Sequence, residues 1–204
     1  MMSRTGGAMP PKERFDHLLK VVASKRFLKK QGLGNEVPFF ICPYPADEAV
    51  AMDAMRGSLI NQLKTRGVRA FEINLYDLSV ALLHDRGIWD EVLAAEPEIS
   101  KAELKELLQG VLDPETHLVP EIGACLSGQE FDVLFLSGVG EVFPYIRSHN
   151  VLNNLQSTAK EKPTVMFFPG TYTHGLATGA SLDLFGTLHD DKYYRAFNIM
   201  HYEI

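Results

Sequence analysis

The stretch Phe131-Asp-Val-Leu-Phe-Leu-Ser-Gly-Val-Gly-Glu-Val-Phe-Pro-Tyr-Ile-Arg147 decides the fold. Its apolar run Val133 to Leu136 is too short for a helix and lacks polar alternation, which is typical of a strand buried on both faces of a parallel sheet. The segment Ser137-Gly138-Val-Gly140 ends this strand, and its two glycines allow a sharp turn or a close backbone approach. Glu141 is predicted to begin a helix that carries Arg147 about two turns further on. This succession is typical of the carboxyl edge of an α/β sheet, where ligands bind.

The composition bounds the class of protein. A chain of 204 residues, 46% hydrophobic and 23% charged, predicts one globular domain, assigned to residues 12–204 after a disordered tail at 1–11. The formal net charge of -6 argues against a dedicated nucleic-acid binder. No apolar segment approaches the ~20 residues of a membrane helix. We expect a cytoplasmic protein in which Cys42 and Cys125 are free, buried thiols.

Four more strands are expected beside the one in the opening stretch. They are placed at Val37–Cys42, Ala70–Leu75, Pro163–Phe168 and Arg195–Tyr202. Because helical patterns separate them, the sequence predicts an α/β fold with a mostly parallel central sheet of about five strands. Helices flank this sheet in a Rossmann-like, three-layer arrangement.

The connecting segments add further expectations. A single amphipathic helix is predicted from Lys12 to about Lys30, and Pro43-Tyr44-Pro45 is predicted as a rigid turn. Short helices from Leu78 to about Leu126 form an insertion between the second and third strands, in which Ser100 to Glu103 fits a capping box. Residues Thr171 to Leu182, rich in glycine and threonine, are predicted as a mobile loop.

Nucleotide-binding signatures are weak in this sequence. No phosphate-binding loop occurs, and the first strand leads into Pro43-Tyr44-Pro45, whose prolines have no amide hydrogen to offer a phosphate. Gly138-Val-Gly140 matches only the start of a dinucleotide fingerprint. We interpret it mainly as a tight turn; a small anion bound at the helix start is the alternative, which the charge of Glu141 opposes.

The candidate site is the carboxyl edge of the predicted sheet. Asp77 and Glu141 either hold Mg²⁺ or share acid–base work there, or serve separately as an N-cap and a surface charge, which we favour. Glu141 and Arg147 are each expected to form an ion pair with another element. No catalytic residue, metal ligand or cofactor is assigned. The candidate ligand or interaction edge comprises Tyr44, Asn74, Asp77, Ser137, Gly138, Gly140, Glu141, Arg147 and Gly170.

A basic cluster near the N-terminus is the one feature that favours DNA contact. It comprises Lys20, Lys25, Arg26, Lys29 and Lys30. Basic residues on a helix are usually a solvated face, and the negative total charge weakens attraction to DNA. Direct DNA binding is therefore not favoured.

Several segments, taken in order, resemble the BrxB-type proteins of bacterial BREX (bacteriophage exclusion) systems. The resemblance runs from about Phe15 to the C-terminus. It is carried by Arg26-Phe-Leu-Lys-Lys-Gln-Gly-Leu-Gly-Asn-Glu-Val-Pro-Phe-Phe-Ile, Glu72-Ile-Asn-Leu-Tyr-Asp-Leu, Leu136-Ser-Gly-Val-Gly-Glu-Val-Phe-Pro-Tyr-Ile-Arg-Ser-His, Leu152-Asn-Asn-Leu-Gln, Phe168-Pro-Gly, Leu184-Phe-Gly-Thr-Leu and Asp191-Lys-Tyr-Tyr-Arg-Ala-Phe-Asn-Ile.

The resemblance implies a small component of a phage-defence complex that methylates host DNA and blocks replication of unmodified phage DNA. It implies as partners a PglZ-type alkaline-phosphatase-like protein, a large BREX ATPase and a methyltransferase. It carries no enzymatic activity onto named residues. The leading hypothesis is a non-catalytic adaptor; the alternative is a nucleotide- or Mg-binding enzyme that uses the carboxyl edge of the sheet.

Overall fold

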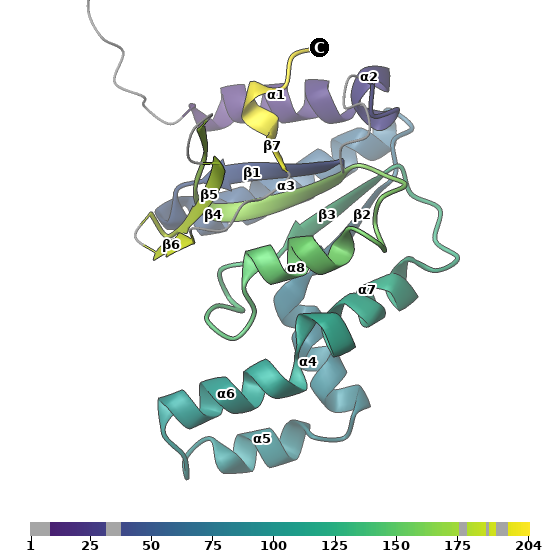
Figure 1. The fold of residues 1–204 in the computed structure, drawn as a ribbon. Coiled ribbons are helices and arrows are strands. Elements are labelled where there is room, and N and C mark those ends of the chain that lie inside the picture. The colour runs from purple at the N-terminus through teal and green to yellow at the C-terminus, as the bar shows by residue number, and fades with distance from the viewer. Residues whose placement is uncertain (1–8, 32–37, 176–178, 187, 191–195) are drawn as a thin grey trace, which may run out of the picture.

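The computed structural model describes residues 9–31, 38–175, 179–186, 188–190 and 196–204. Its centre is a parallel sheet with the strand order β2-β3-β4-β1-β7, which confirms the predicted α/β fold (Figure 1). The strands are β1 (Phe39–Tyr44), β2 (Ala70–Asn74), β3 (Val133–Ser137), β4 (Thr164–Gly175) and β7 (Phe197–Asn198). In the opening stretch, all five residues of β3 are buried, as its unbroken apolar run predicts.

Alternate side chains of the strands enter two separate cores, one on each face of the sheet. In β3, Val133 and Phe135 belong to one core, and Leu134 and Leu136 belong to the other. The helices α1 (Pro11–Val22) and α3 (Ala49–Thr65) cover the first face. The second face is covered by α4 (Leu75–Asp85), α7 (Val119–Leu126) and α8 (Ser148–Leu155). The predicted three layers follow directly from this alternation.

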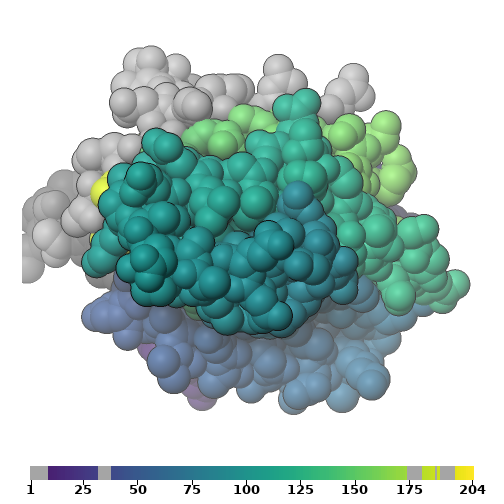
Figure 2. Space-filling model, turned by 90° about the horizontal axis from the view of Figure 1, so that it is seen from below, coloured from purple at the N-terminus to yellow at the C-terminus, as the bar shows by residue number. Residues whose placement is uncertain are grey.

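The predicted helical insertion between β2 and β3 is confirmed. After α4 the chain forms α5 (Trp89–Ala95), α6 (Lys101–Val111) and a π-helical turn, η2 (Pro114–Leu118), before α7. Ser100 and Glu103 form the predicted capping box at the start of α6. Helices α5 and α6 lie at the end of the molecule farthest from the sheet, and from below they cover the front of the molecule (Figures 1 and 2).

The N-terminal half departs from the sequence-based boundaries at two places. The predicted helix from Lys12 to Lys30 is interrupted, because Ser24 caps a separate short helix, α2 (Lys25–Leu28). The predicted turn at Pro43 to Pro45 is wrong in part, since β1 continues through Tyr44. Proline is tolerated there because β7 pairs only with Phe40 and Ile41, so at Pro43 the strand has β4 as its described neighbour. Residues 1–8 of the predicted tail lie outside the described residues.

The predicted mobile loop at Thr171 to Leu182 is wrong for the residues that are described. Strand β4 continues past Pro169 to Gly175 and pairs antiparallel with β5 (Gly179–Leu184), which in turn pairs with β6 (Leu188–Asp190). Pro169 ends the parallel pairing with β1, and Gly170 begins the antiparallel pairing with Leu184. Glycine and threonine composition indicated a loop, but cross-strand pairing determines the structure here.

The predicted closing strand is shorter than expected. Only Phe197–Asn198 is β7, and Ile199–His201 forms a 3-10 turn, η3, whose start is capped by the Asn198 side chain. The first residue of the predicted strand, Arg195, lies outside the described residues. Ile199 is fully buried against α1 and β1, so η3 packs into the core on the first face of the sheet.

Both cysteines are free thiols, as predicted, but the prediction that both are buried is wrong for Cys125. Cys42 is fully buried, and burial raises its pKa to about 12. Cys125 is partly exposed on α7, with a pKa raised by partial burial and by the negative charge of Glu121. Because the thiolate is the reactive form, Cys42 is protected from thiol reagents in two ways: the side chain is inaccessible, and its raised pKa keeps it protonated.

Thiol titration tests this difference. In the native protein at pH 8, dithionitrobenzoate is expected to react with Cys125 first, and with Cys42 only at the rate at which the protein opens. Cys125→Ser should remove the fast phase. Equal reaction rates for the two thiols would contradict the buried position of Cys42.

Candidate functional site

The glycines of the opening stretch are required by close packing. Gly138 has φ +73°, and a Cβ placed on it would lie 2.2 Å from Asn74 Oδ1. That oxygen caps α4 by accepting hydrogen bonds from the amides of Tyr76 (2.9 Å) and Asp77 (3.3 Å). A Cβ on Gly140 would lie 3.0 Å from Pro169 Cγ and 3.3 Å from Phe185 Cε1. Both glycines therefore let the turn after β3 approach the neighbouring strand ends.

Gly170 has a similar role at the end of the parallel part of β4. A Cβ placed there would lie 2.2 Å from the carbonyl oxygen of Asp183, on the paired strand β5. The glycines predicted as candidate ligand positions thus lie against protein atoms of the carboxyl edge. Their small size lets the turn after β3, the start of α4 and the strands β4 and β5 pack together.

The predicted helix start at Glu141 is wrong. Residues 138–147 form turns, and α8 begins only at Ser148, with Arg147 as its N-cap residue. Pro144 explains the difference, because it lacks an amide hydrogen and disfavours helical geometry in the preceding residue. Among the described residues neither Glu141 nor Arg147 forms the predicted ion pair with another element.

Ser137 belongs to a partly buried polar network that was not predicted from the sequence. Its hydroxyl donates to Glu72 Oε1 at 2.6 Å, and the same oxygen accepts from Arg56 Nε at 2.6 Å. Arg56 also pairs with Asp53 at 2.7 Å. Burial opposes the charge of Arg56, but the hydrogen bond to Asp53 and the charge of Glu72 raise its pKa further. The network connects α3 to β2 and β3. Glu72, in the middle of β2, is the one local signal that could have indicated it, but it does not identify the partners.

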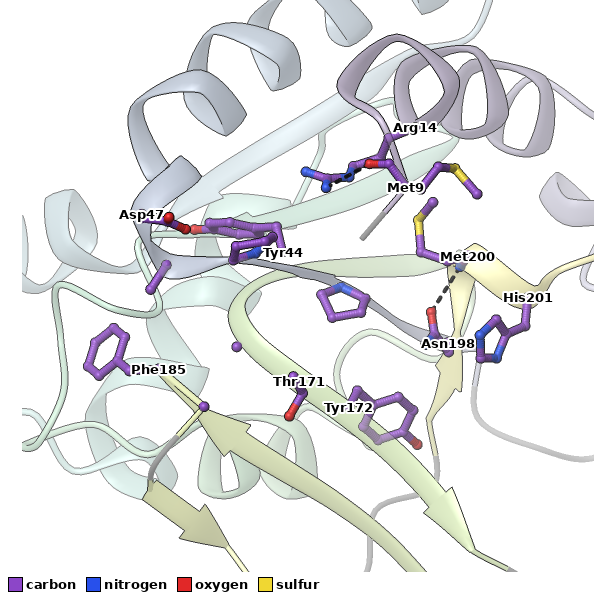
Figure 3. Close-up of a pocket in the computed structure, with 15 residues that line it drawn as sticks. Met9, Arg14, Tyr44, Asp47, Thr171, Tyr172, Phe185, Asn198, Met200 and His201 are labelled. Atoms are coloured by element: carbon purple, nitrogen blue, oxygen red, sulfur yellow. Dashed lines mark hydrogen bonds between the residues drawn. The ribbon is translucent and has the colours of Figure 1, made fainter. Parts of the chain in front are cut away.

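A cavity of about 760 Å³ lies at the carboxyl end of β1 and just past the parallel part of β4, between these strands and Asn198 to His201 (Figure 3). The chain leaves β1 toward the first face, whereas it leaves β3 and enters β4 from the second face. The cavity thus lies outside the carboxyl end of β1, at the edge where open α/β sheets bind ligands. Of the predicted edge residues, Tyr44 and Gly170 line this cavity; Asn74 and Asp77 line a separate groove beside β2.

The polar groups around this cavity are already partly engaged. Arg14 is 3% exposed and donates to Glu48 at 2.7 Å and to the carbonyl oxygen of Met9 at 3.1 Å. Asp47 and Glu48 occupy the turn before α3, where a phosphate would otherwise meet a helix start. Burial, followed by the charges of Asp53 and Glu141, raises the pKa of Tyr44 above its usual value. A polyphosphate would therefore meet carboxylates and prolines here.

Asp77, predicted as an N-cap residue or a metal ligand, lies at the start of a helix. It lies in the first turn of α4, whose partial positive charge favours a carboxylate.

In the described part of the chain, no group of three or more His, Cys, Asp and Glu residues is arranged to hold a metal ion. In the basic cluster, Arg26 lies over the ring of Tyr202 and Lys30 donates to the carbonyl oxygen of Lys160. The described helices include none of the length and hydropathy that a membrane crossing requires.

Together, the fold and this edge define a helix-flanked parallel α/β protein with a helical insertion and a carboxyl edge closed largely by its own loops. The family model described as "BrxB: BREX protein BrxB" matches residues 71–199. The chain belongs to this family, so it is a BrxB component of a BREX phage-defence system.

Two curated relatives agree with this assignment. BREX protein BrxB of Bacillus cereus (strain H3081.97) is 34% identical over 194 residues, covering 92% of this chain and 96% of the relative. BREX protein BrxB of Escherichia coli O9:H4 (strain HS) is 28% identical over 187 residues, covering 92% of this chain and 90% of the relative. The comparison with solved structures gives no significant match.

Proposed function

We propose that this protein is a non-catalytic adaptor of its BREX system, acting in the cytoplasm. It supports host DNA methylation and exclusion of phage DNA by holding other BREX proteins together. The partners we propose are the PglZ-type alkaline-phosphatase-like protein, the large BREX ATPase and the methyltransferase. The family assignment supports the BREX context, and the use of the edge glycines and of the Arg56 network for packing supports the non-catalytic role.

The observation that carries the proposal is the incompletely covered helical insertion. Helix α6 is amphipathic, yet none of its residues is buried. Leu107 on α6 and Leu93 on α5 are 36% and 45% exposed. Between α4, α5 and α6 lies a shallow cavity of about 150 Å³ with Leu93, Leu104 and Leu108 in its lining. An apolar stripe left partly open at the far end of a molecule is typical of a protein–protein contact.

Co-purification tests this surface. The tagged Leu93→Glu/Leu107→Glu variant is purified at moderate salt from cells that carry the whole BREX operon. The amount of co-purified partner is expected to fall about tenfold or more below that of the wild type, because charges would replace apolar contacts. Val50→Glu is the matched control, since Val50 is 85% exposed on α3, outside the insertion.

Two results would count against the proposal. If the wild-type chain retains no other operon product, the adaptor role is wrong. If the double variant retains its partners while remaining folded, the insertion is not the contact surface.

The cavity at the ends of β1 and β4 favours a second candidate function, the binding of a small ligand in a nucleotide- or Mg-dependent enzyme. Its volume of about 760 Å³ lies within the range of ligand sites. Calorimetric titration with ATP, GTP and NAD⁺, each with MgCl₂, tests this candidate. The adaptor proposal predicts no saturable heat; one-to-one binding that is weakened by Asn198→Ala, at the cavity wall, would favour the enzyme.

A further inference from the structure

Strand β2 is one edge of the parallel sheet. It pairs with β3 along Ala70 to Asn74, and the strand order places it at the end of the sheet. The carbonyl oxygen of Arg69 accepts from the amides of Asp132 (2.8 Å) and Val133 (3.3 Å) of the neighbouring chain segment. Since alternate residues of a parallel strand bond to the same neighbour, the backbone groups of Ala70 and Glu72 face the open side. Unpaired edge groups of this kind are a template for another strand.

A groove of about 530 Å³ runs along this edge. Four consecutive residues of the chain, Phe71 to Asn74, line it. Because neighbouring side chains of a strand point to opposite faces, a groove that contacts all four opens at the free edge of the strand. Its walls come from both layers of helices, with Arg56 of α3 on one side and Leu78, Ala81 and Cys125 of α4 and α7 on the other.

The two walls differ in chemistry. Phe71, Ile73 and Leu78 make the side toward α4 and α7 apolar. On the α3 side, the single cation Arg56 is shared by the carboxylates of Asp53 and Glu72. Asp77 adds another carboxylate to the lining and forms no ion pair with any described residue. Within the described lining, the two carboxylates Glu72 and Asp77 outnumber the one cation, Arg56, which favours a positively charged occupant.

We propose that the free edge of β2 binds an extended segment of another BREX protein by strand addition. The bound segment alternates apolar residues, which face α4 and α7, with lysine or arginine residues, which face Glu72 and Asp53. Main-chain hydrogen bonds to Ala70 and Glu72 supply affinity, and the two walls supply specificity. This inference rests on the adaptor role and identifies a contact separate from the exposed leucines of α5 and α6.

Site-specific cross-linking in cells that express the whole BREX operon tests the proposal. The photoreactive residue p-benzoylphenylalanine is placed at Ala81, an exposed residue of the groove wall, or at Ala51, an exposed residue of α3 outside the groove. Mass spectrometry of the purified, irradiated full-length protein is expected to show one cross-linked segment of an operon product from Ala81 and none from Ala51. That segment should show the alternating apolar and basic pattern.

Two variants of the unlabelled protein complete the test. Ala70→Pro removes an outward-facing amide at the first residue of an edge strand, where proline is tolerated. Ala81→Arg places a positive charge, of the same sign as the basic residues of the proposed segment, in the groove wall. The longer side chain also fills part of the groove from an exposed position on α4. Each should reduce the retained partner about tenfold or more while the thermal unfolding midpoint changes little.

The outcomes separate this inference from the adaptor role. If the wild type and both variants retain equal amounts of partner, and Ala81 gives no cross-link, the strand-addition site is wrong while the adaptor role stands. A cross-link from Ala81 to a second copy of this chain would also overturn the assigned occupant. If the wild type retains no operon product, the adaptor role fails, and this inference fails with it.

Discussion

Replacing Gly138 with alanine is expected to lower the free energy of unfolding by about 2–4 kcal/mol. The backbone there has φ +73°, which costs an L-residue roughly 1–2 kcal/mol. The new Cβ would also lie 2.2 Å from Asn74 Oδ1 and displace the cap of α4, which is worth about 1 kcal/mol. At ~2–4 °C per kcal/mol for a chain of this size, thermal unfolding monitored by circular dichroism should show a midpoint lower by roughly 5–15 °C.

Gly57→Ala is the matched control for this substitution. Gly57 lies inside α3, where an added Cβ meets nothing within 4 Å. Alanine should therefore stabilise the protein slightly, by up to about 1 kcal/mol. The Asn74→Ala background gives a second check, because removing the Oδ1 atom should reduce the cost of Gly138→Ala. Equal costs in both backgrounds would mean that contact with the helix cap is not the cause.

The second large effect is expected at Arg56. Arg56→Ala removes the partner of Glu72 and leaves its carboxylate, and the hydroxyl of Ser137, without the central cation. Removing one member of a buried pair costs ~3–5 kcal/mol. Because the Glu72 side chain is 28% exposed, water can compensate in part, and we expect a loss of about 2–4 kcal/mol. Urea unfolding measures this change.

Arg69→Ala is the control for the Arg56 network. Arg69 pairs with Glu130 and Asp132, but its side chain is 52% exposed, so its loss should shift the unfolding midpoint little. A double-mutant cycle between Arg56→Ala and Glu72→Ala should give a coupling of about 1–3 kcal/mol. Additive single effects would contradict a direct interaction between these two residues.

The buried elements of the fold were predictable from sequence because their patterns are local. The apolar runs of β1, β3 and β4 and the capping box at Ser100 each depend on a few neighbouring residues. The errors have two separate causes. Residues 170–175 pair with residues 179–184 as strands despite a loop-like composition, because cross-strand pairing outweighs composition there. Pro144 prevents the helix expected at Glu141, which is a local effect of a single residue.

The candidate edge was predicted only in part, because contacts between residues distant in the sequence form much of it. Its location followed from the direction of parallel strands, and Tyr44 and Gly170 do line the cavity there. The Arg56–Glu72–Ser137 network joins three elements, and Ser137 comes 65 positions after Glu72 in the chain, so no local pattern predicted its partners. The groove beside β2 depends on strand order, which periodicity in one sequence does not reveal.

Native mass spectrometry of the tagged protein, purified at moderate salt from cells expressing the whole BREX operon, tests the central claim most directly. It reports both the protein partners and any small molecule that remains bound. The account predicts a stoichiometric complex with at least one other BREX protein, in which the mass of this chain is that of its sequence alone. A chain that appears without any BREX partner and carries a bound nucleotide or cofactor would contradict the account.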